Sequence, residues 1–419
     1  MAPRLNPLHG IRSAQGAVCD NRISTVTTSH CIQINQRVIN TMPSSLWKKI
    51  AGATLVLLAV STGRAQPLND VSAVPANSAV RQETTLKLPA PKDGRTRPLV
   101  VVLADNAGTE TTDFVIPYGV LKESGVADVV TVSTGPGAVT LMPALKIRTD
   151  MTAKQFDSAT PSGADILIVP AMHASDTPAL LDWVRAQSKK GAVIVSICEG
   201  AWVVANAGLL EGKSATTHWY ALKSIAKKFP GTTWVRDRRF VVDGRVMTTT
   251  GVSASIPASL ALVESIAGRP AADLTAQRLG IGAWGSEHDS SAFDLTARHI
   301  AVVAANWLAR WRHETVEIPI EEGFDEISTA LTADAWSRTY RSQATATNAG
   351  GAVRSRRGLL IETEAASKPG HYVLPTAPGA KAITLKATLD DIAARYGEPT
   401  ANLVALELEH RRRRPGRWD

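Results

Sequence analysis

Cys198 is the residue whose type and position in this chain best suit covalent chemistry. It follows the apolar, β-branched run Ala192–Ile197 and precedes the small-residue pattern of 199–207. Such a run predicts a buried parallel strand, and the pattern after it predicts a tight turn and a helix. Free N–H groups and the helix dipole favour a thiolate at a helix N-terminus, so Cys198 is a candidate nucleophile. The alternative is a buried structural cysteine, the commoner fate of an isolated thiol.

Asp113 and His218 are the acid and the base that could serve this thiol. Asp113 follows the loop after an apolar strand, and such loops open at the carboxyl edge of a doubly wound sheet, as the Cys198 turn does. A carboxyl there can share a proton with the sulfur. Asp113 can also be the N-cap of the helix that follows it, and the two roles are compatible. His218 can act as an acid or a base, whereas an isolated histidine is more often structural.

The stretch Ile168–His173 is a candidate oxyanion site. It is a strand that ends in proline and leads into a tight turn. The peptide N–H of Met172, together with that of Glu199 directly after the thiol, could stabilise a developing negative charge. His173 lies at the same edge, but a loop residue that faces solvent is the favoured interpretation for it.

The sequence predicts neither a metal nor a cofactor. Its nine histidines are scattered, without an HExxH motif or paired cysteine spacing. The glycines of Gly135-Pro-Gly137 and Gly350-Gly351 match neither phosphate-binding loop motif.

Between Pro98 and about residue 270, strand patterns alternate with helical patterns. The strands that we expect are Leu99–Ala104, Val129–Val132, Asp165–Pro170, Ala192–Ile197, Phe240–Val242 and Val246–Thr250. The helices that we expect are Asp113–Glu123, Thr177–Gln187, Ser253–Ala267 and one directly after Cys198. Strands that alternate with helices predict an α/β fold, with a mostly parallel sheet covered on both faces.

Residues 271–419 predict a smaller, mixed α+β region. We expect helices at Arg298–Trp311, Asp325–Tyr340 and Thr388–Tyr396, a loop at Ala344–Arg357 and a late strand at Asn402–Glu409. No internal repeat is evident in the sequence. The basic end, which contains Arg411 to Arg414, is expected to be a solvated tail.

Residues 42–65 have the features of a signal peptide. Lys48 and Lys49 precede the short apolar run Ile50–Val60, and a small-residue cleavage signal follows. Because this run is short for a membrane span, we expect a periplasmic or extracellular protein. The alternative is an uncleaved membrane anchor at residues 47–62.

The flanking segments carry no globular pattern. Residues 1–41 are polar and patternless, and are expected to be disordered or to precede the true start. Residues 66–96 are rich in Pro, Asn, Ser, Thr and charge, which predicts a linker. Cleavage after residue 65 would leave Cys198 as the sole cysteine and exclude an intramolecular disulfide framework.

The ends of the chain supply the formal net charge of +8. Residues 1–65 hold seven Lys or Arg and one acid, and the rest of the chain holds 39 basic and 37 acidic residues. The folded body is therefore nearly neutral, and we expect no nucleic-acid partner.

Two stretches around the thiol, Ser196–Ala201 and Ala207–Trp219, together resemble the ThiJ/PfpI superfamily of class I glutamine amidotransferase-like proteins. Supporting stretches are Asp113–Leu121, Ile166–Pro170 and Val242–Val252. The similarity covers about 97–270 and is greatest to the amidotransferase-like domain at the front of many AraC-type regulators. In those regulators a helix-turn-helix follows. Here the second helix is not convincing, because Thr388–Gly397 runs into the strand-like Leu403–Glu409.

The resemblance implies a flavodoxin-like three-layer sandwich with Cys198 at a sharp strand-to-helix elbow. It places Asp113 where the family keeps an acid hydrogen-bonded to the thiol, and His218 where several members keep a histidine near that thiol. It also implies a homodimer. Two functions are compatible with it: a cysteine-dependent hydrolase or hydratase acting on a small electrophile, or a non-catalytic module that binds a small ligand or senses oxidation through Cys198.

Overall fold

A computed structural model describes residues 85–365, 370–375 and 385–412. The segments expected to be a disordered start, a signal peptide and most of a linker lie outside these residues, as does the end of the basic tail. Within the described residues, no helix is long and apolar enough to cross a membrane.

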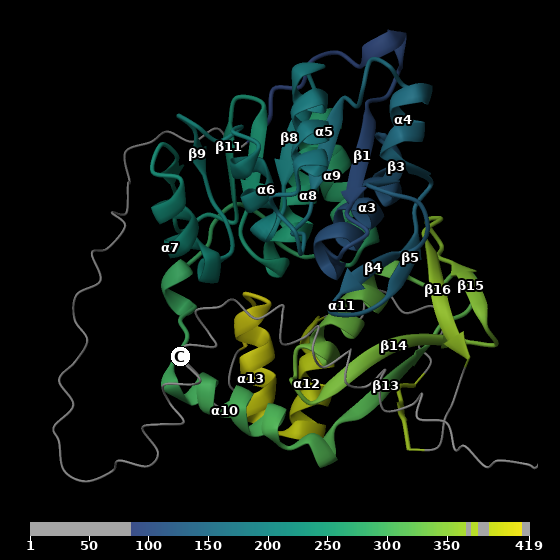
Figure 1. The fold of residues 1–419 in the computed structure, drawn as a ribbon, viewed down its shortest axis with the longest axis vertical. Coiled ribbons are helices and arrows are strands. Elements are labelled where there is room, and N and C mark those ends of the chain that lie inside the picture. The colour runs from purple at the N-terminus through teal and green to yellow at the C-terminus, as the bar shows by residue number, and fades with distance from the viewer. Residues whose placement is uncertain (1–84, 366–369, 376–384, 413–419) are drawn as a thin grey trace, which may run out of the picture. The chain divides into compact units, whose positions relative to one another are not determined.

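The main sheet is built from the strands that the sequence predicts and from the short edge strand β6, which it does not predict (Figure 1). They are β1 (Leu99–Ala104), β3 (Asp128–Ser133), β6 (Met151–Thr152), β7 (Ile166–Val169), β8 (Val193–Ser196), β11 (Phe240–Asp243) and β12 (Val246–Thr249). Their order is β11-β12-β8-β7-β1-β3-β6, and β11 is the strand that runs antiparallel to its neighbour. The predicted strands 99–104, 129–132, 165–170, 192–197, 240–242 and 246–250 are confirmed within a few residues.

Helices cover both faces of this sheet because its central strands are apolar on both sides. Along β1, Val100 and Val102 face one core and Val101 and Leu103 face the other. The helices of this part are α3 (Thr111–Ser124), α4 (Ala153–Ala159), α5 (Pro178–Lys189), α6 (Ala201–Asn206), α7 (Trp219–Lys228), α8 (Val252–Ala267) and α9 (Arg269–Arg278). The first core contains residues of α3, α8 and α9, and the second contains residues of α4 to α7. The predicted α/β sandwich with a mostly parallel sheet is confirmed.

A second sheet joins the C-terminal region to the first part of the chain. Its order is β17-β13-β14-β16-β5-β4-β2, with β15 paired to β16. Its strands are β2 (Thr109–Glu110), β4 (Val139–Met142), β5 (Lys146–Arg148), β13 (Glu314–Pro319), β14 (Ser342–Asn348), β15 (Gly351–Arg354), β16 (Leu360–Ala365) and β17 (Tyr372–Val373). The strands thus come from both sides of the domain boundary predicted at residue 270, whose position stays a prediction.

Smaller elements complete the described chain. They are the helices α10 (Ala297–Leu308), α11 (Glu326–Ser337), α12 (Leu385–Tyr396) and α13 (Glu398–Glu407), the pair β9 (Ser214–Ala215) and β10 (Thr233–Trp234), and the 3-10 turns η1 (Lys92–Gly94), η2 (Cys198–Gly200), η3 (Ser290–Ala292) and η4 (Arg310–Arg312). The predicted helices at 298–311, 325–340 and 388–396 correspond to α10, α11 and α12.

Two predictions for the C-terminal region are wrong. The expected loop Ala344–Arg357 contains most of β14 and all of β15, because small residues alternate there with threonines and only the inward positions are apolar. Most of the expected late strand Asn402–Glu409 lies in α13, and its last two residues form a turn after the helix. Its leucines fit helical spacing as well as alternation, and a glycine with positive φ followed by Pro399 in the first turn marks a helix start.

The helix α13 directly follows α12, so the second helix that the sequence analysis did not find is present. It is nevertheless buried over most of its length, from Thr400 to Leu406. A helix packed in this way offers little free surface to a DNA groove.

Candidate active site

Cys198 lies in a tight turn between β8 and α6. Its φ of 55° is in the left-handed region, which a non-glycine residue occupies when its surroundings hold it there. Its N–H donates to Thr249 Oγ1 over 3.0 Å, and its carbonyl accepts from Thr217 Oγ1 over 2.9 Å. The predicted strand, turn and helix are confirmed, and the thiol is held at the carboxyl end of β8.

Gly200 explains how the turn can sit so tightly on the sheet. A Cβ atom at this position would lie 2.1 Å from the carbonyl oxygen of Val169, at the end of β7. No other residue fits without movement of the backbone. The glycine therefore fixes the turn against the strand that leads to the predicted oxyanion loop.

Asp113 is completely buried in the first turn of α3. Its Oδ2 accepts from the N–H of Ala171 over 3.2 Å, whereas its Oδ1 has no partner among the described residues. The pKa of Asp113 is raised to about 7, chiefly because the carboxyl is buried. Asp113 can therefore hold or release a proton near neutral pH, and one of its oxygens is free to do so.

The alternative role predicted for Asp113, that of N-cap, belongs to Glu110. Its carboxylate accepts from the N–H of Asp113 over 2.6 Å and from Thr112 Oγ1. The longer Glu side chain folds back onto the first turn and supplies the cap, which leaves Asp113 inside the helix. Burial and the Asp113 carboxyl raise the pKa of Glu110 to about 7, against the opposing charge of Arg338.

The thiol of Cys198 does not have the environment of a thiolate. Burial, followed by the carboxylates of Asp113, Glu199 and Glu110, raises its pKa well above the usual value. The N–H of Glu199 acts in the opposite direction but does not prevail. The expectation of a thiolate stabilised at the helix N-terminus is corrected: surrounding acids and burial outweigh the backbone dipoles.

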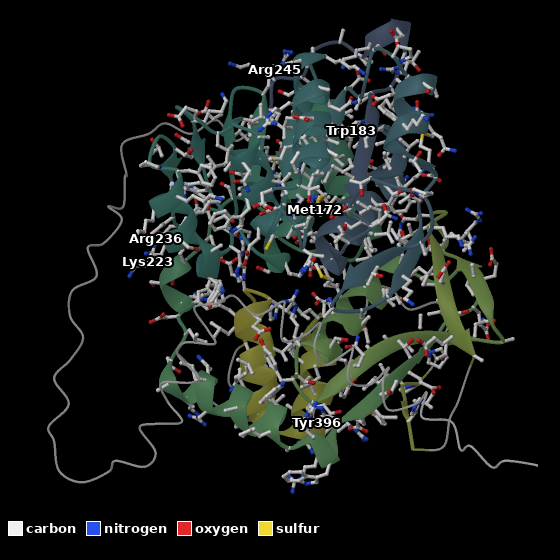
Figure 2. The ribbon with its side chains drawn as sticks, in the orientation of Figure 1. Met172, Trp183, Lys223, Arg236, Arg245 and Tyr396 are labelled. Atoms are coloured by element: carbon white, nitrogen blue, oxygen red, sulfur yellow. The ribbon has the colours of Figure 1, made fainter. Side chains whose placement is uncertain are left out.

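The two predicted oxyanion donors lie on adjacent segments. Glu199 follows the thiol, and its N–H favours the sulfur anion. Met172 forms an isolated antiparallel bridge with Thr109, flanked by bonds from Glu110 N to Ala171 O and from His173 N to Gly108 O. Met172, labelled in Figure 2, comes shortly after the end of β7. His173 is exposed, as the favoured interpretation predicts.

His218 turns towards the C-terminal region. Its Nε2 lies 3.1 Å from the carbonyl oxygen of Glu407, and its Nδ1 lies 3.8 Å from Glu199 Oε1. The neighbouring Trp219 donates from Nε1 to the carbonyl of Leu406. The histidine is thus buried and anchored by α13, while its second nitrogen faces the acid beside Cys198.

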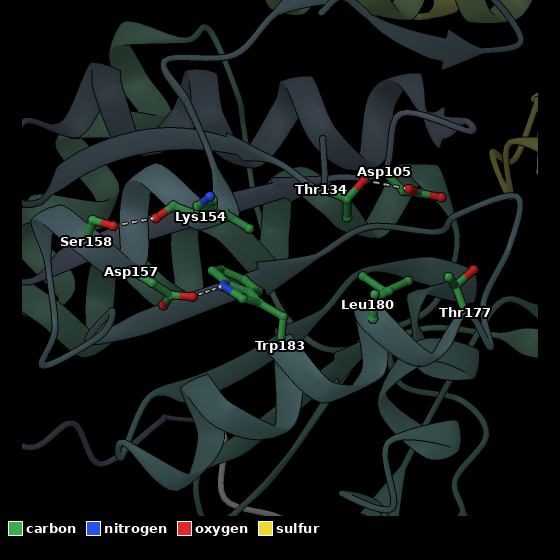
Figure 3. A pocket seen from close by; sticks show the side chains of 10 residues that line it. Asp105, Thr134, Lys154, Asp157, Ser158, Thr177, Leu180 and Trp183 are labelled. Atoms are coloured by element: carbon green, nitrogen blue, oxygen red, sulfur yellow. Dashed lines mark hydrogen bonds between the residues drawn. The ribbon is translucent and has the colours of Figure 1, made fainter. Parts of the chain in front are cut away.

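A hollow between α4 and α5 is separate from these residues (Figure 3). It encloses about 560 Å³ and is lined by residues that include Asp105, Asp157 and Trp183. Trp183 Nε1 donates to Asp157, and Thr134 Oγ1 donates to Asp105. Its acids are engaged with their neighbours, and its lining includes none of Cys198, Asp113, Glu110 and His218.

Comparison with known proteins gives the family. Residues 99–265 match the model of the DJ-1/PfpI family. The chain carries a DJ-1/PfpI family domain. The predicted resemblance is confirmed, and Cys198, Asp113, Met172, Glu199 and His218 all lie inside the matched range.

Individual relatives belong to different functional classes. The chain is 31% identical over 123 residues to the HTH-type transcriptional regulator CdhR of Pseudomonas aeruginosa, covering 29% of this chain and 36% of the regulator. It is 36% identical over 119 residues to an isonitrile hydratase of Pseudomonas putida, covering 28% of this chain and 49% of that enzyme. It is 27% identical over 175 residues to protein dj-1beta of Drosophila melanogaster, covering 41% of this chain and 89% of that protein. The matches thus span about a third to a half of the first two relatives.

Residues outside the DJ-1/PfpI domain complete the cluster around its acids. Arg338, directly after α11, donates from Nη2 to Glu110 Oε1 and from Nε to Asp334 Oδ1, each over 2.7 Å. Its Nη1 lies 3.9 Å from Glu407 Oε2. Tyr340 OH donates to Glu407 Oε1 over 2.7 Å. An arginine from the C-terminal region therefore balances acids that flank the thiol.

These residues were not predicted from the sequence, and only one local signal could have indicated them. Asp334 and Arg338 are four residues apart, a spacing that pairs opposite charges on a helix. That spacing predicts an ordinary surface pair. It does not indicate that Arg338 reaches Glu110 across 228 residues of chain.

Glu409 closes the cluster on the side of α8. Its carboxylate accepts from the N–H of Gly251, the N-cap of α8, and lies 2.8 Å from His288 Nε2. Glu409 is buried and has a φ of 54°. The end of the described chain is thus anchored beside the helix that follows β12. Among the described residues, no group of three or more His, Cys, Asp or Glu is arranged to hold a metal ion.

Proposed function

We propose that this protein is a cysteine-dependent hydrolase or hydratase that acts on a small electrophile. The observation that carries the proposal is the strained turn at Cys198, beside a buried Asp113 whose Oδ1 has no partner among the described residues. Strain at a turn and an unsatisfied buried oxygen both cost free energy, and such costs are concentrated at functional sites. The similarity to an isonitrile hydratase supports the same class of chemistry.

In this proposal, Asp113 moves the proton. As Cys198 Sγ bonds to the electrophilic carbon, its proton passes to the Asp113 carboxylate, and the electron pair moves to the heteroatom bonded to that carbon. The N–H groups of Met172 and Glu199 receive the developing charge. Asp113 then returns the proton, and water releases the product and restores the thiol. A carboxyl with a pKa of about 7 suits both directions of transfer at neutral pH.

His218 would assist through Nδ1, the nitrogen that faces Glu199. Because its Nε2 is held at the carbonyl of Glu407, the ring has a fixed orientation. We propose a supporting role for His218 in the protonation of the substrate or in the placement of water.

The second candidate function is a sensor or regulator module. The similarity to CdhR favours it, because part of a transcriptional regulator matches this domain. So does the raised pKa of Cys198, which slows attack by the thiol at neutral pH. In this case the pocket binds a small ligand, or Cys198 is oxidised to a sulfinate as a signal.

Thiol labelling and turnover separate these possibilities. We expect Cys198 of the folded protein to react with iodoacetamide, increasingly as the pH rises, and Cys198→Ser to abolish turnover of a substrate from panels of isonitriles, glyoxals and amides. A thiol that stays unreactive in the folded protein would refute both thiol-based functions. If Cys198 is labelled but no turnover depends on it, the enzyme function is refuted and the sensor function remains.

We also propose that the protein is exported, on the strength of residues 42–65. Cell fractionation with sequencing of the mature N-terminus tests this. A start near Gln66 in the periplasmic fraction is expected, and an intact N-terminus in the membrane fraction would favour the anchor at 47–62. The homodimer implied by the family resemblance also remains a proposal.

A further inference from the structure

Two stretches of this chain have the same order of elements at a constant spacing. The strand β13 (Glu314–Pro319) corresponds to β1 (Leu99–Ala104) at an offset of 215 residues. At the same offset in sequence, α11 corresponds to α3 and β14 corresponds to β3, and the ends of each pair agree within two residues. The strands β15 and β16 follow β14 as β4 and β5 follow β3. Residues 314–365 thus repeat the elements of 99–148.

The two helices also begin and end alike. Glu110 caps α3 by accepting from the N–H of Asp113, and Asp325 caps α11 by accepting from the N–H of Ser328. The backbone after α3 turns at Gly125 with φ 67°, and after α11 it turns at Tyr340 with φ 58°. A positive φ costs free energy at a tyrosine but not at a glycine. Because Tyr340 nevertheless has the same conformation as Gly125, the turn after the helix is preserved in both stretches.

The strand pairing agrees with this correspondence. β1 is paired in parallel with β3 on one side and β7 on the other. β13 is paired in parallel with β14 on one side and β17 on the other. Each copy therefore places its first strand between its second strand and a later one.

The contacts between the copies are reciprocal. Thr112 Oγ1 lies 3.4 Å from Asp334 Oδ2. A Cβ on Gly119 would lie 2.6 Å from Ile327 Cγ1, and these two positions are the 215-residue equivalents of Asp334 and Thr112. Reciprocal pairs of this kind define an isologous contact around a two-fold axis.

The strands that join the copies are reciprocal as well. In the antiparallel pair of β5 and β16, Ile147 is opposite Ile361 and Lys146 is opposite Glu362. At the offset of 215, Ile147 is equivalent to Glu362 and Lys146 to Ile361. The approximate axis therefore passes between β5 and β16 as well as between α3 and α11.

The two ends of the helix pair carry different ion pairs. At one end, Arg338 bonds directly to Glu110. At the equivalent end, Glu123 and Asp325 are both acidic, and Arg357 joins them over 2.8 and 3.0 Å. The end that carries Arg338 adjoins the acids of the thiol site.

We infer that residues 314–365 are a quasi-equivalent second copy of residues 99–148, and that Arg338 of this copy is a positioning residue for Glu110 and Asp113 beside Cys198. The two-fold contact that symmetric dimers form between two chains is formed here within one. The sequence analysis found no repeat because the aligned residues are mostly different. In the second copy, Ser328 stands at the position of Asp113, so the copy supports a site and does not duplicate it.

The test compares two partly buried arginines at opposite ends of this contact. Arg338 contacts Glu110 and Asp334, and lies near Glu407, which Tyr340 binds. The charges of Asp113, Glu199 and Glu110 act on the Cys198 thiol. Removal of the positive charge of Arg338 should raise the pKa of the acidic groups near it, the thiol included. Arg338→Met should therefore move the pH profile of iodoacetamide labelling at Cys198 upward by about one pH unit, while the matched control Arg357→Met should leave the profile in place.

A second readout does not depend on the thiol. In Arg338→Met, the loss of unfolding free energy with rising pH should extend further above pH 7 than in the wild type, and this difference should become smaller when Glu110→Gln is also present. The inference rests on the proposed function only for the labelling. If the wild-type thiol does not label but the unfolding curves differ in this way, the proposed function fails and the positioning role stands.

Equal labelling profiles of the two Met variants, together with a wild-type pH dependence of unfolding in Arg338→Met, would overturn the positioning role. If Arg338→Met does not fold, Arg338→Lys and Arg357→Lys take their places. Lysine keeps the charge but loses the forked geometry, so Arg338→Lys should give a smaller upward shift and Arg357→Lys none. Equal profiles of the Lys variants would overturn the role in the same way.

Discussion

The guanidinium of Arg338 lies 2.7 Å from Glu110 Oε1, although 228 residues separate them in sequence. Glu110 in turn binds the N–H of Asp113, the acid next to the candidate nucleophile. A chain of polar contacts therefore runs from the C-terminal region to the backbone of Asp113, whose charge acts on Cys198. It follows that the region after residue 270 is part of the candidate site, and not only a neighbour of the DJ-1/PfpI domain.

Asp113→Asn should separate thiol ionisation from catalysis. The substitution removes a carboxylate that raises the pKa of Cys198, so alkylation of the thiol by iodoacetamide should become faster at neutral pH. It also removes the proton acceptor, so turnover of any substrate found should fall by about 10²- to 10⁴-fold.

Asp105→Asn is the matched control for this experiment. Asp105 is another buried acid at the end of β1, and it accepts from Thr134 Oγ1. It should change neither the labelling rate nor turnover. Turnover by Asp113→Asn at the wild-type rate would remove the proton-transfer role of Asp113.

The stability of the protein should fall as the pH rises through the range in which Glu110 and Asp113 titrate. Both have a folded-state pKa of about 7, above their ordinary values of 4.5 and 3.8. The stability linked to their protons is complete below those ordinary values, because both states are then protonated. It is lost as the pH rises towards 7, because the unfolded chain ionises first.

Glu110→Gln should make this pH dependence shallower by up to about 1.4 kcal/mol per pH unit between pH 5 and pH 7. The measurement is urea unfolding at several pH values, read as the slope and not as the absolute free energy, since the variant also weakens the cap of α3. Glu287→Gln, at an exposed side chain, serves as the control. A slope equal to that of the wild type would contradict a raised pKa for Glu110.

The sequence predicts the elements of the domain well because their signals are local. The apolar run 99–104 and the helical spacing of 113–123 correspond to β1 and α3 almost residue for residue. The elbow at Cys198 is local too: a β-branched run, a turn and small residues lie within a few positions. The pairing of the thiol with Asp113 followed from the expected sheet topology, and the family resemblance added support for Asp113 and His218.

What the sequence could not predict depends on distant parts of the chain. The cap by Glu110 was missed because Asp113 is also a common N-cap residue, and only the folded side chain shows which acid bends back. The pKa of Cys198 depends on burial and on acids that the fold gathers around it. Arg338 has no local mark of its role, since its partner Asp334 makes it look like half of a surface pair.

Gly119→Val should disturb the contact between the two copies. A Cβ there would lie 2.6 Å from Ile327 Cγ1 and 3.0 Å from Glu326 Oε1, so the Ile327 side chain or α11 itself must shift. We expect a loss of about 1–3 kcal/mol in unfolding free energy, measured by urea denaturation. Gly282→Val is the control, because a Cβ at Gly282 has no neighbour within 4 Å. Equal stability of the two variants would show that α3 and α11 do not pack this closely.

A single chain should contain a complete thiol site. The helix α3 is buried from Thr111 to Leu121, and α11 of the same chain covers one of its sides. The second copy therefore supplies in cis what a symmetric partner would supply in trans. If this is correct, the rate constant for labelling of Cys198 should not change when the protein is diluted from micromolar to nanomolar concentration, with the mass followed by sedimentation. A homodimer of the kind that the family resemblance implies would then have to use another surface. A rate that changes in step with dissociation of a dimer would show instead that a second chain completes the site. The arginine that binds Glu110 would then come from that second chain.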